Sequence, residues 1–141
     1  MIVLDSCALV DIARQTDEGR ALQQLMLVNE KAISCDLIRA EIASVFRKLT
    51  KTEGLTASQA ETYLGTALEL IDEFVPMSEL QTEAFRESVR LNQSTYDMFY
   101  FVLARRTGAT LFTLDRKLIR LCQNHGVECV DEVALEQVEG I

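Results

Sequence analysis

Four acidic residues occupy positions where their neighbours in the sequence are mainly apolar. Asp5 and Asp115 each directly follow an apolar run. Asp97 lies near the start of the most apolar helical segment, and Glu41 borders an apolar stripe. Carboxylates that are crowded together repel one another, and this repulsion raises their pKa values unless a cation relieves it. Because carboxylate oxygens suit hard divalent cations such as Mg²⁺, the four residues are candidates for one shared metal site.

Three of these acids also have a purely structural explanation. Asp5 and Asp115 come just before predicted helices, where aspartate is a favoured N-cap. Asp97 ends the segment 94–97 (STYD), which has the pattern of a capping box, and a negative charge there suits the helix dipole. The local sequence alone leaves capping and metal binding open for each of them.

Glu41 is harder to explain by local structure. Apolar residues in 37–51 recur at the three- and four-residue spacing of an amphipathic helix, and Glu41 borders the resulting stripe. Burying an acid costs free energy unless it meets a donor or a cation. Contact with water, or pairing with Arg39 or Lys48, would explain this residue without a metal.

Apolar periodicity and turn residues predict an alternation of strands and helices along the chain. This order favours parallel strands with right-handed crossovers, and so a three-layer α/β/α sandwich with a mainly parallel, about five-stranded sheet. The expected strands are 1–4, 31–35, 73–77, 109–114 and 127–130. The expected helices are 6–13, 20–28, 37–51, 56–70, 79–91, 96–106, 116–124 and 132–138.

The predicted sheet brings two of the acids to one edge. Ligands of open parallel sheets bind at the carboxyl ends of the strands. Asp5 follows the first expected strand and Asp115 follows the fourth, so both should lie at this edge.

Length and composition narrow the classes of protein further. The 141 residues are the size of one domain, so we expect a single domain over 1–141. No run is apolar and long enough to span a membrane, and the first residues lack the pattern of a signal peptide, which favours a cytoplasmic protein.

The net charge of −8 argues against a broad cationic face for nucleic acid, although metal ions would offset clustered acids. The four cysteines form no C-x-x-C pair and stand at no zinc-finger spacing from His125, so neither a zinc site nor a disulfide framework is expected.

Four segments together resemble the motifs of PIN-domain proteins. They are 2–9 (IVLDSCAL), 40–45 (AEIASV), 94–100 (STYDMFY) and 111–118 (LFTLDRKL). Each motif is weak alone, but four of them in the right order across one short chain are a specific signal. The resemblance covers essentially the whole chain and implies a PIN-like fold.

The resemblance also implies an activity and a set of site residues. It implies an endoribonuclease that hydrolyses RNA phosphodiester bonds with Mg²⁺ or Mn²⁺. Ser6 and Thr113 match the hydroxyl positions of the family and would orient water or a neighbouring carboxylate. The residues that would hold the metal and carry out catalysis are Asp5, Glu41, Asp97 and Asp115.

The size of the chain and its Ser-x-Tyr-Asp motif look most like VapC-type toxins of toxin–antitoxin pairs. This likeness implies a homodimer that cleaves RNA and is silenced by a VapB-like antitoxin. Two alternatives stay open: an RNA-processing nuclease without an antitoxin, and a non-catalytic PIN-like module that only binds.

Other residues near the motifs have weaker interpretations. Many PIN-domain relatives carry a further acid shortly after the fourth motif's aspartate, whereas Arg116 and Lys117 follow here. These two side chains either contact RNA phosphate or belong to a solvated first helical turn. Tyr96, Phe99 and Tyr100 lie in an almost wholly apolar segment, so we expect all three in the core.

Overall fold

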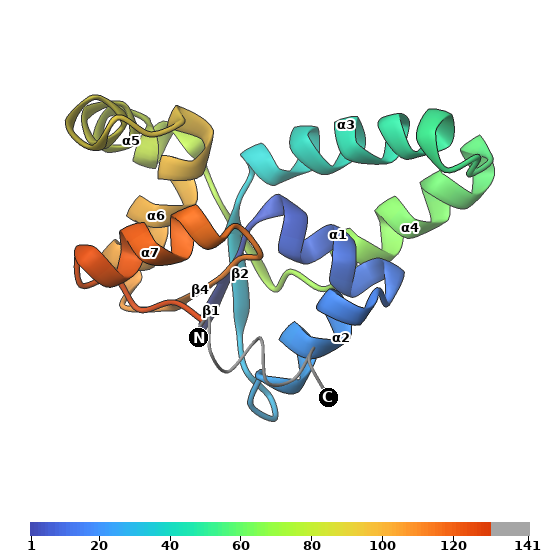
Figure 1. The fold of residues 1–141 in the computed structure, drawn as a ribbon, viewed down its shortest axis with the longest axis horizontal. Coiled ribbons are helices and arrows are strands. Elements are labelled where there is room, and N and C mark those ends of the chain that lie inside the picture. The colour runs from blue at the N-terminus through green and yellow to red at the C-terminus, as the bar shows by residue number, and fades with distance from the viewer. Residues whose placement is uncertain (131–141) are drawn as a thin grey trace.

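The computed structural model describes residues 1–130 and shows strands and helices alternating along the chain (Figure 1). The strands are β1 (Ile2–Leu4), β2 (Ala32–Cys35), β3 (Glu73–Val75) and β4 (Thr110–Phe112). The helices are α1 (Ser6–Arg14), α2 (Asp17–Gln24), α3 (Leu37–Thr52), α4 (Ala57–Glu69), α5 (Met77–Leu91), α6 (Thr95–Thr107) and α7 (Arg116–Asn124).

The strands form a parallel sheet in the order β3-β2-β1-β4, which confirms the predicted α/β class. The two neighbours of β1 are β2 and β4, and all three residues of β1 are buried. Such a strand reads as a continuous apolar run because both of its faces are covered. β3 lies at one edge of the sheet and is followed by Pro76, in keeping with the edge position that a proline favours.

Helices cover both faces of this sheet (Figure 1). Helices α1, α2, α3 and α4 lie on one side, and α5, α6 and α7 lie on the other. Helix α6 packs on β1, β2 and β4, and its residues from Met98 to Ala104 are all buried, as its apolar sequence predicts. Helices α3 and α4 pack together as a helical hairpin. The three layers of the predicted sandwich are therefore present.

The helix boundaries depend on specific caps and on one close contact. Thr56 and Gln59 form a capping box at the start of α4. The second helix begins earlier than predicted, at Asp17, because the Thr16 side chain accepts a hydrogen bond from the backbone N–H of Gly19. A Cβ atom at Gly19 would lie only 2.0 Å from the carbonyl oxygen of Asp11, so α2 can approach α1 this closely only with glycine there.

The prediction of a fifth strand at 127–130 is wrong. This segment makes a single parallel bridge, between Leu111 and Cys129. The Leu111 N–H donates to the Glu128 carbonyl at 2.9 Å, and the Val130 N–H donates to the Leu111 carbonyl at 3.0 Å. Because only one residue of the segment pairs with β4, no further ladder develops within the described residues. The helix expected at 132–138 lies outside the described residues.

Candidate active site

The acidic residues gather at the carboxyl edge of the sheet. Asp5 directly follows β1, and its N–H donates to the carbonyl of Phe112, the last residue of β4, at 3.2 Å. Asp115 lies three residues beyond this point, at the start of α7. Glu41 lies in the second turn of α3, and Asp97 lies in the first turn of α6. Two strands, β1 and β4, and four helices, α1, α3, α6 and α7, therefore position the four acids.

Asp5 is the most deeply buried of the four, with only 4% of its surface exposed. Its carboxylate accepts a hydrogen bond from the Ala8 N–H at 2.9 Å, so it caps α1 as a structural aspartate would. It also meets the hydroxyl of Thr113 and the thiol of Cys7. Burial raises the pKa of Asp5 to about 7, against the lowering effect of these hydrogen bonds. Capping a helix does not remove the electrostatic cost of this buried charge.

Asp97 couples electrostatically to all three other acids. Its negative charge raises the pKa values of Asp5 and Glu41, and the charge of Asp115 raises its own. Burial is the largest cause of the raised pKa of Asp97, and a hydrogen bond from Gln93 Nε2 at 3.1 Å opposes it. The predicted capping box does not form, because the Ser94 side chain makes no capping hydrogen bond.

Glu41 has a partner that the sequence did not reveal. The buried hydroxyl of Tyr100 donates a short hydrogen bond to Glu41 Oε1. Burial raises the pKa of Glu41, and this hydrogen bond partly lowers it. Arg39, one of the two expected partners, instead lies over the ring of Phe74, 3.9 Å from its centroid. The sequence held one indication of this contact. Tyr100 lies three residues after Asp97, so both side chains project from the same side of α6.

Asp115 caps α7 and is connected to Asp5 through Thr113. The Asp115 carboxylate accepts hydrogen bonds from the N–H groups of Lys117 at 3.0 Å and Leu118 at 3.4 Å. Its own N–H donates to the Thr113 hydroxyl at 3.1 Å, and that fully buried hydroxyl also bonds Asp5. Through these hydrogen bonds Thr113 links Asp5 and Asp115, which follow the neighbouring strands β1 and β4.

The remaining predicted residues lie around this group. Ser6 is half-buried at the start of α1 and shares a pocket wall with Glu41. Lys117 is exposed, and its positive charge lowers the pKa of Asp97. Arg116 is partly buried at the first position of α7. All eight candidate residues therefore lie at or beside one edge of the sheet.

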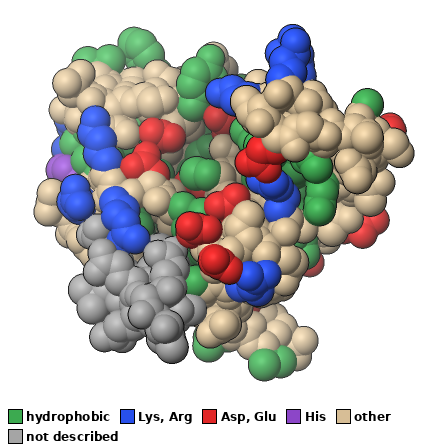
Figure 2. Space-filling model, turned by 45° about the vertical axis from the view of Figure 1, so that its right-hand side comes forward, with side chains coloured by type: hydrophobic (Ala, Val, Ile, Leu, Met, Phe, Trp, Pro, Cys, Tyr) green, Lys and Arg blue, Asp and Glu red, His purple; other side chains and the backbone are tan. Residues whose placement is uncertain are grey.

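The four acids fit a divalent cation in chemistry, but they do not form a ready-made cage. Within residues 1–130, no three His, Cys, Asp or Glu side chains stand close enough together to hold a metal ion. No ion pair between described residues involves Asp5, Glu41, Asp97 or Asp115. Their oxygens are the ligand type that Mg²⁺ prefers, and a cation would offset both the burial and the mutual repulsion. Acidic side chains also gather near the middle of the face shown in Figure 2, with Lys and Arg side chains beside and around them.

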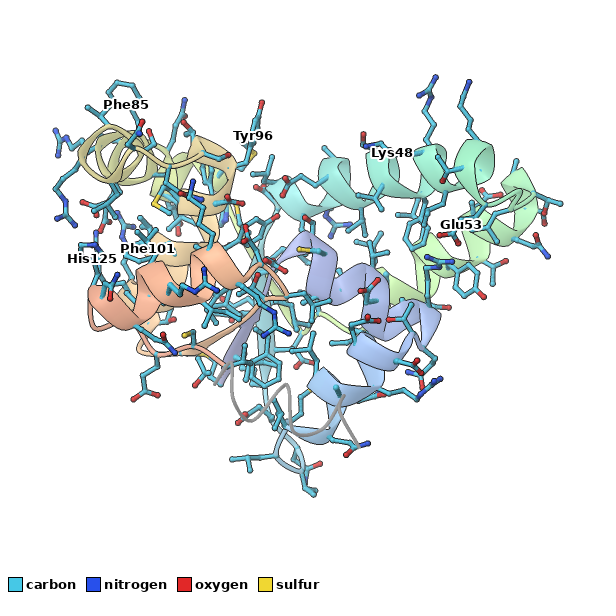
Figure 3. The ribbon with its side chains drawn as sticks, viewed as in Figure 1. Lys48, Glu53, Phe85, Tyr96, Phe101 and His125 are labelled. Atoms are coloured by element: carbon cyan, nitrogen blue, oxygen red, sulfur yellow. The ribbon has the colours of Figure 1, made fainter. Side chains whose placement is uncertain are left out.

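An open pocket of about 340 Å³ adjoins the acids. It lies between the start of α3 and the start of α6, and Tyr96 forms one wall of it. The prediction that Tyr96 is a core residue is wrong, because its side chain is 61% exposed and points away from the core (Figure 3). Tyr96 lies in the first turn of α6, ahead of the buried part of that helix. The residues that line the pocket are Ser6, Leu37, Ala40, Glu41, Ser44, Val45 and Tyr96.

No helix among residues 1–130 is both long and apolar enough to cross a membrane.

Comparison with known proteins identifies the family. The crystal structure of PAE2754 from Pyrobaculum aerophilum is similar, with a TM-score of 0.68 and 23% identity, over 99% of this chain and 97% of that one. The structure of VapBC-1 from nontypeable Haemophilus influenzae has a TM-score of 0.62 and 13% identity, over 93% of this chain and 98% of that one. At these identities the two likenesses show a shared fold. No curated protein matches the sequence. The model of the PIN domain family matches residues 2–124, and the chain therefore belongs to the PIN domain family.

Proposed function

We propose that the protein is a Mg²⁺- or Mn²⁺-dependent endoribonuclease. The observation that carries this proposal is that the four acids, from four separate segments, lie at the carboxyl edge of the sheet, where the charge of Asp97 raises the pKa values of Asp5 and Glu41. Membership of the PIN domain family supports it, because nucleases are common in that family. Asp5, Glu41, Asp97 and Asp115 are the residues that would hold the metal.

When bound, one or two such ions activate water and neutralise the charge of the phosphodiester during hydrolysis. The residues of the chain prepare the site for this reaction, which would leave a 5′-phosphate. Thr113 orients the carboxylate of Asp5, and Tyr100 fixes that of Glu41. Ser6 lies beside Glu41, where its hydroxyl would orient water.

The number of metal ions depends on the residues after the fourth motif. Arg116 and Lys117 stand where many relatives carry a further acid, so we propose that a second ion binds weakly or only together with RNA. Lys117 is exposed, and its positive charge is close enough to Asp97 to lower the pKa of Asp97. We therefore assign Lys117 a contact with an RNA phosphate next to the metal.

RNA cleavage by purified protein tests the activity. We expect Mg²⁺-dependent cleavage of single-stranded RNA, and its loss in Asp5→Asn and Asp97→Asn while both variants stay folded by circular dichroism. Asp17→Asn is a matched control, because Asp17 is an exposed residue of α2 whose side chain pairs with Arg20. Normal cleavage by pure Asp97→Asn would reject the assignment. A non-catalytic binding module, the second candidate, would bind RNA without cleaving it at any Mg²⁺ concentration.

We further propose that the protein is the toxin of a toxin–antitoxin pair. The VapC-like motif at 94–97 supports this, and so does the similar fold of VapBC-1. Expression of the gene alone should arrest growth, and coexpression with an adjacent antitoxin gene should relieve the arrest. Growth unaffected by expression of an active nuclease would favour an RNA-processing enzyme.

We also propose that two copies form a homodimer. In support, three apolar residues at four- or eight-residue spacing stay exposed on α5: Met77, Phe85 and Val89. Exposed apolar stripes of this kind often mark protein interfaces. Light scattering should give twice the mass of one chain for the wild type, and that of one chain for Phe85→Asp. A monomeric wild-type protein would reject the dimer.

A further inference from the structure

The pocket beside Glu41 has a lining suited to an uncharged, flat group. Leu37, Ala40 and Val45 give it an apolar floor, and Ser44 adds a hydroxyl. Among the described residues that line it there is no Lys or Arg, and Glu41 is an acid, so the pocket would repel a phosphate or any other anion. A volume of about 340 Å³ is at the lower limit of small-molecule pockets, which suits one small ring system better than a helix or a duplex.

Tyr96 supplies the feature that points to a base. The first turn of α6 holds it at the rim of the pocket, 61% exposed, with its ring free to meet a ligand. Single-stranded RNA is commonly bound by stacking its bases on exposed aromatic rings. The serine hydroxyls nearby can both donate and accept hydrogen bonds at the edge of a base.

The pocket adjoins the four acids, because Glu41 is one of them and also lines the pocket, with Ser6, the neighbour of Asp5, in the same lining. A strand whose phosphate lies at the acids must place an adjoining nucleotide next to them. The charged part of that nucleotide is directed to the metal and the basic residues, and only its base is neutral. An apolar, anion-repelling pocket at this position therefore complements the base.

We propose that this pocket binds the base of a nucleotide adjoining the scissile phosphate, with Tyr96 stacking on it. This inference rests on the proposed ribonuclease function, because it assumes that the scissile phosphate lies at the acids. The pocket then selects unpaired RNA, since a base engaged in a duplex cannot enter it.

Cleavage kinetics of Tyr96 variants test this site. Tyr96→Ala should lower kcat/KM for a single-stranded oligoribonucleotide at least about fivefold, because stacking on the ring is lost. Tyr96→Phe should retain most of the activity, since the ring remains. Both variants should fold normally, because the side chain is exposed. A series of oligonucleotides, each lacking the base at one position, completes the design. Removal of the base at one of these positions should lower cleavage by the wild type. On that oligonucleotide, Tyr96→Ala should lower cleavage no further.

The outcomes separate this inference from the proposed function. If the wild type cleaves RNA and Tyr96→Ala cleaves it equally fast, the base site alone is overturned. The pocket would then bind an apolar side chain of a protein partner instead. Equal losses from Tyr96→Ala on intact and base-lacking oligonucleotides at every position would also overturn it, because the ring would then act without a base. Absence of any metal-dependent cleavage by the wild type would overturn the ribonuclease assignment, and the base site with it.

Discussion

Replacing Asp5 by asparagine should stabilise the metal-free protein at neutral and alkaline pH. The native environment raises the pKa of Asp5 from 3.8 to about 7, chiefly by burial. The folded protein therefore binds a proton that the unfolded chain has released between these two pH values, and its stability falls as the pH rises through them. At about 1.4 kcal/mol for each pH unit, ionising this carboxyl costs the folded state about 4 kcal/mol in total.

Asparagine keeps the shape of the side chain and remains a good N-cap, so the hydrogen bond from Ala8 should survive. The free energy of unfolding of Asp5→Asn should therefore equal that of the wild type near pH 4 and exceed it at pH 8 by up to about 4 kcal/mol. Lost hydrogen bonds to the carboxylate reduce this gain.

Urea denaturation in EDTA across the pH range measures the difference directly. Asp17→Asn, at an exposed position of α2, serves as the control and should show no such pH-dependent gain. Added Mg²⁺ should stabilise the wild type and not Asp5→Asn, because the cation offsets the charge that the variant lacks. A stability difference between Asp5→Asn and the wild type that stays constant from pH 4 to pH 8 would refute the reasoning.

Five further substitutions, at four positions, test structural and chemical roles separately. Tyr100→Phe leaves the carboxylate of Glu41 without its donor, so it should cost about 1–3 kcal/mol of unfolding free energy. It should also move the acid limb of the pH–rate profile upward, because the pKa of Glu41 rises; an unmoved limb would argue against a role for Glu41. Asp115→Ala should lose about 1 kcal/mol in urea denaturation through the lost cap of α7, whereas Asp115→Asn should keep the cap and lose only metal-dependent cleavage. Gly19→Ala should lower the free energy of unfolding by at least about 2 kcal/mol, because the new Cβ atom would clash with the backbone of α1. Gly65→Ala should raise it by up to about 1 kcal/mol, because this helical position has open space around it. Equal stabilities of the two glycine variants would contradict the close packing of α1 and α2.

The sequence predicted the elements whose patterns are long and regular. The apolar stripe of 37–51 and the buried segment 96–106 both appear as helices close to their expected bounds. The rule that ligands bind at the carboxyl edge of a parallel sheet predicts from the sequence alone that Asp5 and Asp115 lie at the same edge. Long periodic segments and strand ends are therefore readable from sequence.

Features that depend on distant parts of the chain were harder to predict. Apolar residues at 127–130 suggested a strand, but only Cys129 pairs with the sheet. Tyr96 was expected in the core because its neighbours are apolar, whereas its place in the first turn of α6 leaves it exposed. The partner of Glu41 is Tyr100, which lies 59 residues away in the sequence, so this contact depends on how α3 and α6 are placed by the fold.

In the proposed site, Asp97 joins the four acids around one cation. Calorimetric titration of Mn²⁺ into the metal-free wild type, Asp97→Asn and Asp17→Asn tests it most directly. The wild type and Asp17→Asn should bind Mn²⁺ with equal affinity, and Asp97→Asn should lose the binding. Unchanged Mn²⁺ binding by a folded Asp97→Asn variant would contradict the account.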